Sequence, residues 1–146
     1  MDTKLIYLFA IILLILSCDP NTREISFLIE NRTTQTLKVS LFEESKENVI
    51  DIFESNKIQF LTYSALGGGF NAIADFDSIG ITTEGNNKSI KWTKPDNAYG
   101  YIDENIGEER DVPKDIYNRK NWKLQMNGDD EEWIFTINSP DLELFE

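Results

Sequence analysis

The amino-acid sequence predicts an all-β fold, a small antiparallel β-sandwich or partly closed barrel that ends in a short helical turn. Three observations predict it. Apolar residues alternate with polar ones through most of the chain. Turn-forming Gly, Asn, Asp and Pro separate the short apolar runs. Residues 25–146 are enough for one core without disulfides, so we expect a single domain of about eight or nine short strands.

The first element is an apolar run from Leu5 to Leu16, twelve residues without a charge. A helix of that length spans about 18 Å, well short of a ~30 Å hydrocarbon core. The length instead suits the apolar region of a secretory signal peptide. We therefore expect residues 1–17 to be a signal peptide.

The sole cysteine of the chain, Cys18, closes this segment in the order Ile15-Leu16-Ser17-Cys18. The order resembles the lipobox of bacterial lipoproteins, in which an apolar and a small residue precede an invariant Cys. The resemblance implies that Cys18 receives a diacylglyceryl thioether, that the Ser17–Cys18 bond is cleaved, and that the new amino terminus is acylated. Two or more acyl chains give stable anchoring. The alternative is an uncleaved apolar anchor with a buried free thiol.

The lipobox resemblance also implies a place in the cell. It indicates a bacterial cell envelope, with the domain anchored to the outer membrane in preference to the inner one. Asp19 resembles the inner-membrane retention signal of some Gram-negative lipoproteins, so the inner membrane stays open as an alternative. Residues 18–24 would form the lipidated Cys and a polar tether of at most ~20 Å.

Four strands are predicted in the first half of the domain. Residues 25–29 and 37–41 alternate apolar and polar positions, and the polar segment 31–35 between them predicts a hairpin. Residues 49–53 and 58–63 predict a second antiparallel pair. Because the segment 49–53 is apolar on both faces, a central position in the sheet is favoured for it.

The clearest predicted hairpin follows. Ile79 and Ile81 face one way, the turn residues 84–87 tolerate positive φ, and Ile90 and Trp92 resume the alternation. Gly67-Gly68-Gly69, before this hairpin, lacks the flanking residues of a phosphate-binding loop and is interpreted as a connection between strands.

Residues 94–118 are predicted to form a long loop, because they hold two prolines, two glycines and several acids. Tyr99 and Tyr101 stand in it without a supporting strand pattern. Aromatic side chains on such loops are typical of recognition, so these two tyrosines are a candidate recognition loop.

The last predicted elements are a hairpin and a helical turn. Alternating apolar residues in 122–126 and 133–137 flank Asn127-Gly128, a turn signal. Ser139-Pro140-Asp141 then predicts the helical turn, since Pro is tolerated at a first helical position and the acid complements the helix dipole. Trp92, Trp122 and Trp133 lie on alternating apolar faces and are predicted to be core residues.

The body of the chain also resembles small, uncharacterised Gram-negative lipoproteins that have a polar tether, a β-sheet body and a closing helical turn. The resemblance covers most of residues 25–142 and implies no activity and no site residue. It is carried by Phe70, Asp75-Phe76-Asp77-Ser78-Ile79, Lys88-Ser89-Ile90-Lys91-Trp92, Asn121-Trp122, Trp133-Ile134-Phe135-Thr136-Ile137 and Pro140-Asp141-Leu142.

Composition excludes several function classes. The chain has no His and one Cys, which removes imidazole bases, His-ligated zinc, Cys-His nucleophiles and intrachain disulfides. Its net charge is −12, from 14 Lys and Arg against 26 Asp and Glu, which opposes nucleic-acid binding. No cofactor and no nucleic-acid partner are therefore expected.

Two groups of acids are candidate cation sites. Asp75 and Asp77 flank Phe76, so an extended strand would place both carboxylates on one face about 7 Å apart while Phe76 enters the core. With further oxygens the pair would suit Ca²⁺, and the alternative is a loop-capping role. Asp129 and Asp130 begin a run of four acids that is a second candidate, with a solvated hairpin tip as its alternative.

These features predict a noncatalytic, lipid-anchored envelope protein, either a binding or a structural module. Its membrane contact runs through the lipid on Cys18. Its acidic charge would steer a basic protein or envelope polymer toward the loops. The alternative is a carboxylate-based divalent-cation-binding module or a metal-dependent envelope enzyme.

Overall fold

Two four-stranded sheets make up the fold in the computed structural model, which describes residues 22–44, 46–66, 69–85, 87–96, 98 and 112–146. The strands are β1 (Arg23–Arg32), β2 (Leu37–Glu43), β3 (Lys46–Ile52), β4 (Lys57–Ala65), β5 (Ser78–Thr83), β6 (Ser89–Thr93), β7 (Trp122–Asn127) and β8 (Asp130–Asn138). Three 3₁₀ helices accompany them: η1 (Asn71–Asp75), η2 (Arg119–Asn121) and η3 (Ser139–Leu144). The all-β class and the closing helical turn are confirmed.

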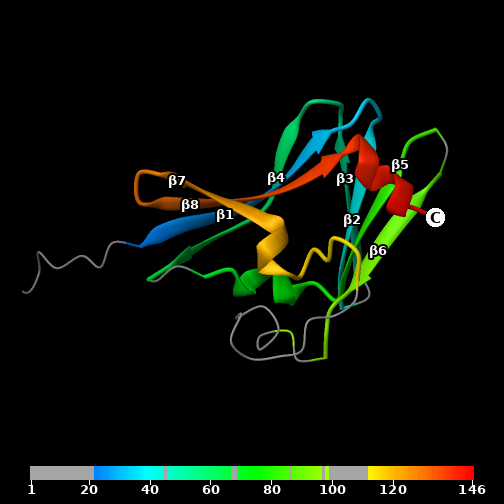
Figure 1. Cartoon of the computed structure of the whole chain (residues 1–146). Coiled ribbons are helices and arrows are strands. Elements are labelled where there is room, and N and C mark those ends of the chain that lie inside the picture. The colour runs from blue at the N-terminus through cyan, green and yellow to red at the C-terminus, as the bar shows by residue number, and fades with distance from the viewer. Residues whose placement is uncertain (1–21, 45, 67–68, 86, 97, 99–111) are drawn as a thin grey trace, which may run out of the picture.

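The two sheets pack face to face as a sandwich, and neither closes into a barrel within the described residues. Sheet A has the strand order β4-β1-β8-β7, and sheet B has the order β3-β2-β5-β6. All neighbouring strands are antiparallel except β1 and β8, which are parallel. The strands of the two sheets cross steeply in Figure 1, as in orthogonal sheet packing.

The predicted hairpin between residues 25–29 and 37–41 is wrong. β1 pairs with β4 and β8 in sheet A, whereas β2 belongs to sheet B. The polar segment between them is a crossover, and the buried side chain of Asn31 satisfies its backbone: the Asn31 amide donates to the Gln35 carbonyl at 2.8 Å. Polar residues between two strands therefore marked a change of sheet rather than a tight turn.

The predicted pairing of residues 49–53 with 58–63 is also wrong. β3 pairs with β2 through a hairpin in which Glu43 lies opposite Lys46. β3 is an edge strand, not a central one, and Val49 on it is 53% exposed. The turn escaped the sequence analysis because a non-glycine residue, Glu44, takes the positive φ of 45° there.

The two later hairpins are confirmed. β5 pairs with β6 around a turn in which Gly85 has φ +104°. β7 pairs with β8 around Gly128, which has φ +68°. Both turns use the left-handed backbone that Gly adopts without steric cost, so local sequence was sufficient to locate them.

The core lies between the sheets and is rich in aromatic rings. Ile25, Phe27 and Ile29 of β1 face it from sheet A, and Leu37 and Val39 of β2 face it from sheet B. The three tryptophans are core residues, as predicted. Each packs against a phenylalanine ring. The distances between ring centres are 5.7 Å for Trp92 and Phe135, 5.0 Å for Phe70 and Trp133, and 5.5 Å for Phe27 and Trp122.

Part of the predicted long loop belongs to the core. Residues 112–118 form neither strand nor helix, yet Ile116 and Tyr117 have no exposed surface. The Tyr117 hydroxyl donates to the Phe76 carbonyl at 2.8 Å, and the Trp122 indole donates to the Ile116 carbonyl at 2.7 Å. These bonds fasten the loop across the end of the sandwich that also holds η1.

Candidate functional site

Asp75 and Asp77 do not form the predicted pair on one strand face. Asp75 ends the 3₁₀ helix η1, and Asp77 lies between η1 and β5, so the segment is not an extended strand. Phe76 is buried between them, 9% exposed, and its backbone N–H donates to the Ile73 carbonyl at 3.3 Å, which closes the helix. The core placement of Phe76 is as predicted.

The Asp77 carboxylate joins three chain segments. One oxygen accepts from the Lys94 ammonium at 3.1 Å, and the other accepts from the Glu44 backbone N–H at 3.0 Å. These two hydrogen bonds lower the pKa of Asp77 below its ordinary value. Asp77 therefore fixes the β2–β3 turn, at Glu44, against the start of β5 and the end of β6, which is the role that the capping alternative gave it.

The acid run at residues 129–132 is divided among different partners. Asp130 accepts from the Glu24 backbone N–H at 2.9 Å. Glu131 is buried, accepts from the Trp133 indole at 3.2 Å and pairs with Arg23 at 3.4 Å. Glu132, on the opposite strand face, pairs with Lys57 at 3.2 Å. The strand pleat thus separates neighbours in sequence, and the run does not converge on one point.

Several residues singled out from the sequence lie outside the described residues: Cys18, Tyr99, Tyr101, Gly67 and Gly68. Gly69 is described, and its carbonyl accepts a hydrogen bond from the Tyr63 hydroxyl. Burial raises the pKa of Tyr63, and the charges of Glu131 and Asp75 act in the same direction. Tyr63 therefore stays a neutral donor that holds the end of the glycine segment.

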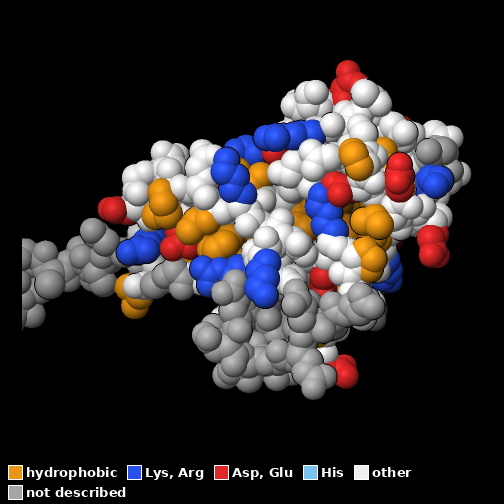
Figure 2. Space-filling model, in the orientation of Figure 1, with side chains coloured by type: hydrophobic (Ala, Val, Ile, Leu, Met, Phe, Trp, Pro, Cys, Tyr) orange, Lys and Arg blue, Asp and Glu red, His pale blue; other side chains and the backbone are white. Residues whose placement is uncertain are grey.

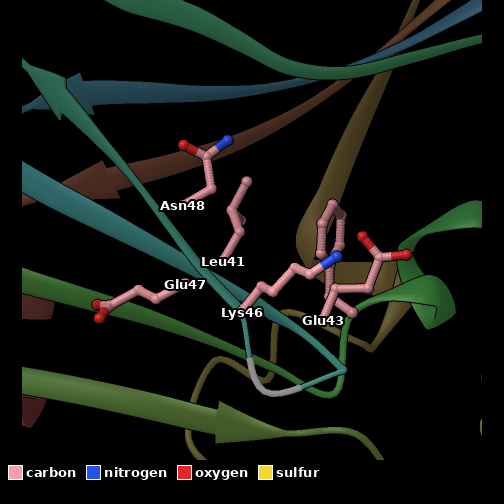
Figure 3. Close-up of a pocket in the computed structure, with 6 residues that line it drawn as sticks. Leu41, Glu43, Lys46, Glu47 and Asn48 are labelled. Carbon is pink, nitrogen blue, oxygen red and sulfur yellow. The ribbon is translucent and has the colours of Figure 1, made fainter.

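A pocket of about 360 Å³ lies beside the β2–β3 hairpin, and we call it the hairpin pocket. Figure 3 shows the Lys46 side chain extending toward Glu43, whereas Glu47 points away from both. Leu41 and Phe76, both buried, give the pocket its apolar lining. The full lining is Leu41, Glu43, Lys46, Glu47, Asn48 and Phe76.

Strand register explains why this pocket is apolar at one end and polar at the other. On the core-facing side of the hairpin, Leu37 lies opposite Ile52, and both are buried. Two rungs further along, Leu41 lies opposite Asn48, and the last rung is Glu43 with Lys46. The hairpin thus extends beyond the core, and its final polar rungs edge a hollow whose far wall is Phe76.

The hairpin and its two ends carry a local excess of acid, which we call the acidic hairpin. It consists of the acids Glu43, Glu44, Glu47, Asp51 and Glu54. All five side chains are exposed, and none has an ion pair or side-chain hydrogen bond with another described residue. One cation, Lys46, lies among them.

This arrangement suits a cationic group from a partner. An ammonium or guanidinium entering the hairpin pocket can pair with the Glu43 carboxylate, and the Phe76 ring belongs to the same lining. Sequence reasoning missed the pocket because Phe76 comes from a segment that begins more than two dozen residues after the hairpin turn. The density of acids between residues 43 and 54 was the one signal available.

No three His, Cys, Asp or Glu side chains gather as a metal site within the described ranges. In the same part of the chain, no helix is long and apolar enough to cross a bilayer. No family model, curated protein or solved structure matches the chain.

Proposed function

We propose that the protein is a noncatalytic, lipid-anchored module of the bacterial cell envelope that binds a basic protein or envelope polymer. The observation that carries the proposal is the position of Cys18. It stands at the end of the apolar run and five residues before β1 begins at Arg23. A folded domain that starts so soon after a lipidated Cys is held close to its membrane.

The acidic hairpin supports the binding part of the proposal. Its carboxylates are exposed and unpaired by described residues, so a partner's Lys or Arg can pair with them without first breaking an internal ion pair. The net charge of −12 adds long-range attraction for a basic partner. The hairpin pocket is the place at which a cationic side chain of the partner would bind.

The anchor is tested by mass spectrometry of the full chain purified from bacterial membranes. We expect the protein to begin at Cys18 and to carry the mass of a diacylglyceryl group and an amide-linked acyl chain. The Cys18→Ser variant should lose these masses and leave the membrane fraction. An intact starting methionine and an unmodified thiol would contradict the anchor.

The binding site is tested by crosslinking pull-down from envelope extracts with the lipidated chain. We expect partner capture to fall when Glu43 and Glu47 are both changed to Gln, and to fall at ~0.3 M salt. The matched control changes Asp129→Asn and Glu143→Gln, two exposed acids outside the hairpin, and removes the same net charge. Equal losses with both variants would place the binding surface elsewhere.

A further inference from the structure

We propose that one end of sheet A rests on the lipid bilayer, with Leu124 and Met126 entering the headgroup region and Arg119, Lys120 and Lys123 contacting anionic lipids. We call these five residues the β7 surface. The inference rests on the proposed lipid anchor and adds to it the orientation of the domain. It places the acidic hairpin, on the other sheet, free to meet a partner.

The apolar part of the β7 surface is exposed although it follows the core-facing side of the strand. Leu124 and Met126 alternate with Trp122, which is buried, but they are 41% and 50% exposed. β7 is the edge strand of sheet A, and nothing in the described chain covers these two side chains. Figure 2 shows hydrophobic side chains over β7 with Lys and Arg on both sides of them.

The charge of this region is opposite to that of the chain. Residues 112–127 contain four basic residues and one acid, a net charge of +3, whereas the whole chain carries −12. The acid, Asp115, is 1% exposed, and the first basic residue, Lys114, pairs with Asp141. The other three basic residues belong to the β7 surface.

One of the basic groups lies close to the apolar side chains in space. The Arg119 guanidinium lies 4.7 Å from the centre of the Trp133 ring. Trp133 is the cross-strand partner of Leu124, so the Arg119 charge sits beside the exposed leucine. Protein surfaces that bind a membrane interface typically have apolar side chains flanked by long basic ones. The aliphatic part of each Lys or Arg contacts the apolar side chains, and its charged group reaches the lipid headgroups.

The proposed anchor arrives at the same end of the sheet. Ile25, near the start of β1, pairs with Glu131, which in turn pairs with Met126. Leu66 also lies at this end, directly after the residue opposite Arg23, and is 73% exposed. The segment from Cys18 to Arg23 spans at most ~18 Å, so the lipid chains hold this end of the sheet near the bilayer.

Acids also lie at this end. Glu131 pairs with Arg23, whereas the Asp130 carboxylate keeps its charge while it accepts from the Glu24 backbone N–H. Glu24 on β1 and Asp129 beside the β7–β8 turn are exposed. Anionic lipids attract the basic cluster within about a Debye length, roughly 8 Å at physiological salt, so proximity decides the contact.

The test uses the full lipidated chain in vesicles of about 70% phosphatidylethanolamine and 30% phosphatidylglycerol. An environment-sensitive fluorophore is attached to the introduced thiol of Met126→Cys or, as a control, Val49→Cys, an exposed position on sheet B. The lipidated Cys18 sulfur does not react. We expect a blue-shifted, brighter emission at position 126 that brominated lipids quench, and no change at position 49.

A second arm tests the charges. Changing Arg119, Lys120 and Lys123 to Gln should weaken the emission change at position 126. Changing Lys38, Lys46 and Lys91 of sheet B to Gln, which removes the same charge, should leave it intact. Thermal unfolding of each variant is measured alongside, and a loss of emission change in a variant that stays folded supports the contact.

Three results would overturn the orientation. With Cys18 shown by mass to be lipidated, equal emission at positions 126 and 49 rejects it and leaves the anchor standing. A change at position 126 that requires an added envelope protein, and not lipid alone, assigns the surface to a protein partner instead. An unmodified Cys18 thiol rejects the anchor and the orientation together.

Discussion

Asn31 shows how one residue ties the two sheets together. Its side chain has no exposed surface, and its amide donates to the carbonyls of Ile52 and Phe53 at 3.0 and 3.1 Å. Its side-chain oxygen accepts from the Thr33 backbone N–H at 2.9 Å. The residue therefore satisfies both crossovers at one end of the sandwich, from β1 to β2 and from β3 to β4.

We predict that Asn31→Ala lowers the free energy of unfolding by about 3 kcal/mol, because it leaves several buried polar groups without partners. Urea unfolding followed by tryptophan fluorescence measures the change. Asn48→Ala is the matched control, since Asn48 is exposed, and its effect should stay within about 0.5 kcal/mol. Similar values for the two variants would contradict the structural role given to Asn31.

The ionisation of Glu30 makes part of the domain's free energy of unfolding depend on pH. Burial raises its pKa, but hydrogen bonds from Thr136 at 2.9 Å and Arg32 at 3.0 Å, with the charges of Arg32 and Lys57, outweigh burial and bring the pKa below the ordinary 4.5. A lowered folded pKa stabilises the fold above the unfolded pKa. That contribution is lost as pH falls through the folded pKa.

We therefore predict that wild type exceeds Glu30→Gln in stability at pH 7 and that the difference shrinks below about pH 4.5. Thr136→Val, which removes the hydroxyl donor, should reduce the same pH-dependent difference. Urea unfolding at a series of pH values from neutral to acidic gives the measurement. A difference that does not change across the series would show that Glu30 ionisation is not coupled to folding.

At the scale of elements, turn chemistry explains which hairpins were foreseen. Gly85 and Gly128 mark two turns with residues that favour positive φ, and both hairpins were predicted. The β2–β3 turn uses Glu44 at φ 45°, which no local rule favours. Its stability comes from contacts made elsewhere, including the Asp77 carboxylate that accepts from the Glu44 backbone N–H.

Two glycines provide a paired test at this scale. Gly128 has φ +68° and open space around an added Cβ, so Gly128→Ala should cost about 1 kcal/mol through backbone strain alone. Gly80 lies in β5 with ordinary φ, and an added Cβ would meet its nearest atom at 3.8 Å. Gly80→Ala should be neutral or slightly stabilising. Thermal melts of both variants decide whether the turn needs Gly128.

At the scale of the whole molecule, η3 connects the sheets. It follows β8 of sheet A and ends beside β6 of sheet B, as Figure 1 shows. The backbone of Glu146 exchanges two hydrogen bonds with Ser89, at 2.8 and 2.9 Å. Phe145, which precedes Glu146, is 3% exposed and packs in the core between the two sheets. The segment thus extends the edge of sheet B and closes one side of the sandwich.

We predict that Phe145→Ala lowers the free energy of unfolding by about 3 kcal/mol through lost burial and a residual cavity. Leu144→Ala is the control, because Leu144 is 39% exposed and its truncation should cost less than about 1 kcal/mol. Urea unfolding of the two variants, with unchanged slopes, gives the comparison. Equal costs would mean that Phe145, directly after η3, does not contribute to the core.

Local chemistry was enough to predict the fold class, two hairpins and part of the core. Period-two patterning gave the all-β class, glycine turns gave two hairpins, and alternation gave the core tryptophans, because each depends on residues close in the chain. The candidate site was not visible in this way. The sequence offered acids by composition, and the Asp75–Asp77 pair and the 129–132 run both proved to be divided among structural partners.

Contacts between distant segments set how the strands associate and which side chains meet. The same alternating pattern fits an edge or a central strand, so β3 and the crossover after β1 were misplaced, and the parallel pairing of β1 with β8 was not foreseen. The hairpin pocket exists because Phe76 packs beside β2. The β7 surface exists because no described residue of sheet B covers Leu124 and Met126. Both depend on contacts between distant segments, for which a single sequence carries no periodic signal.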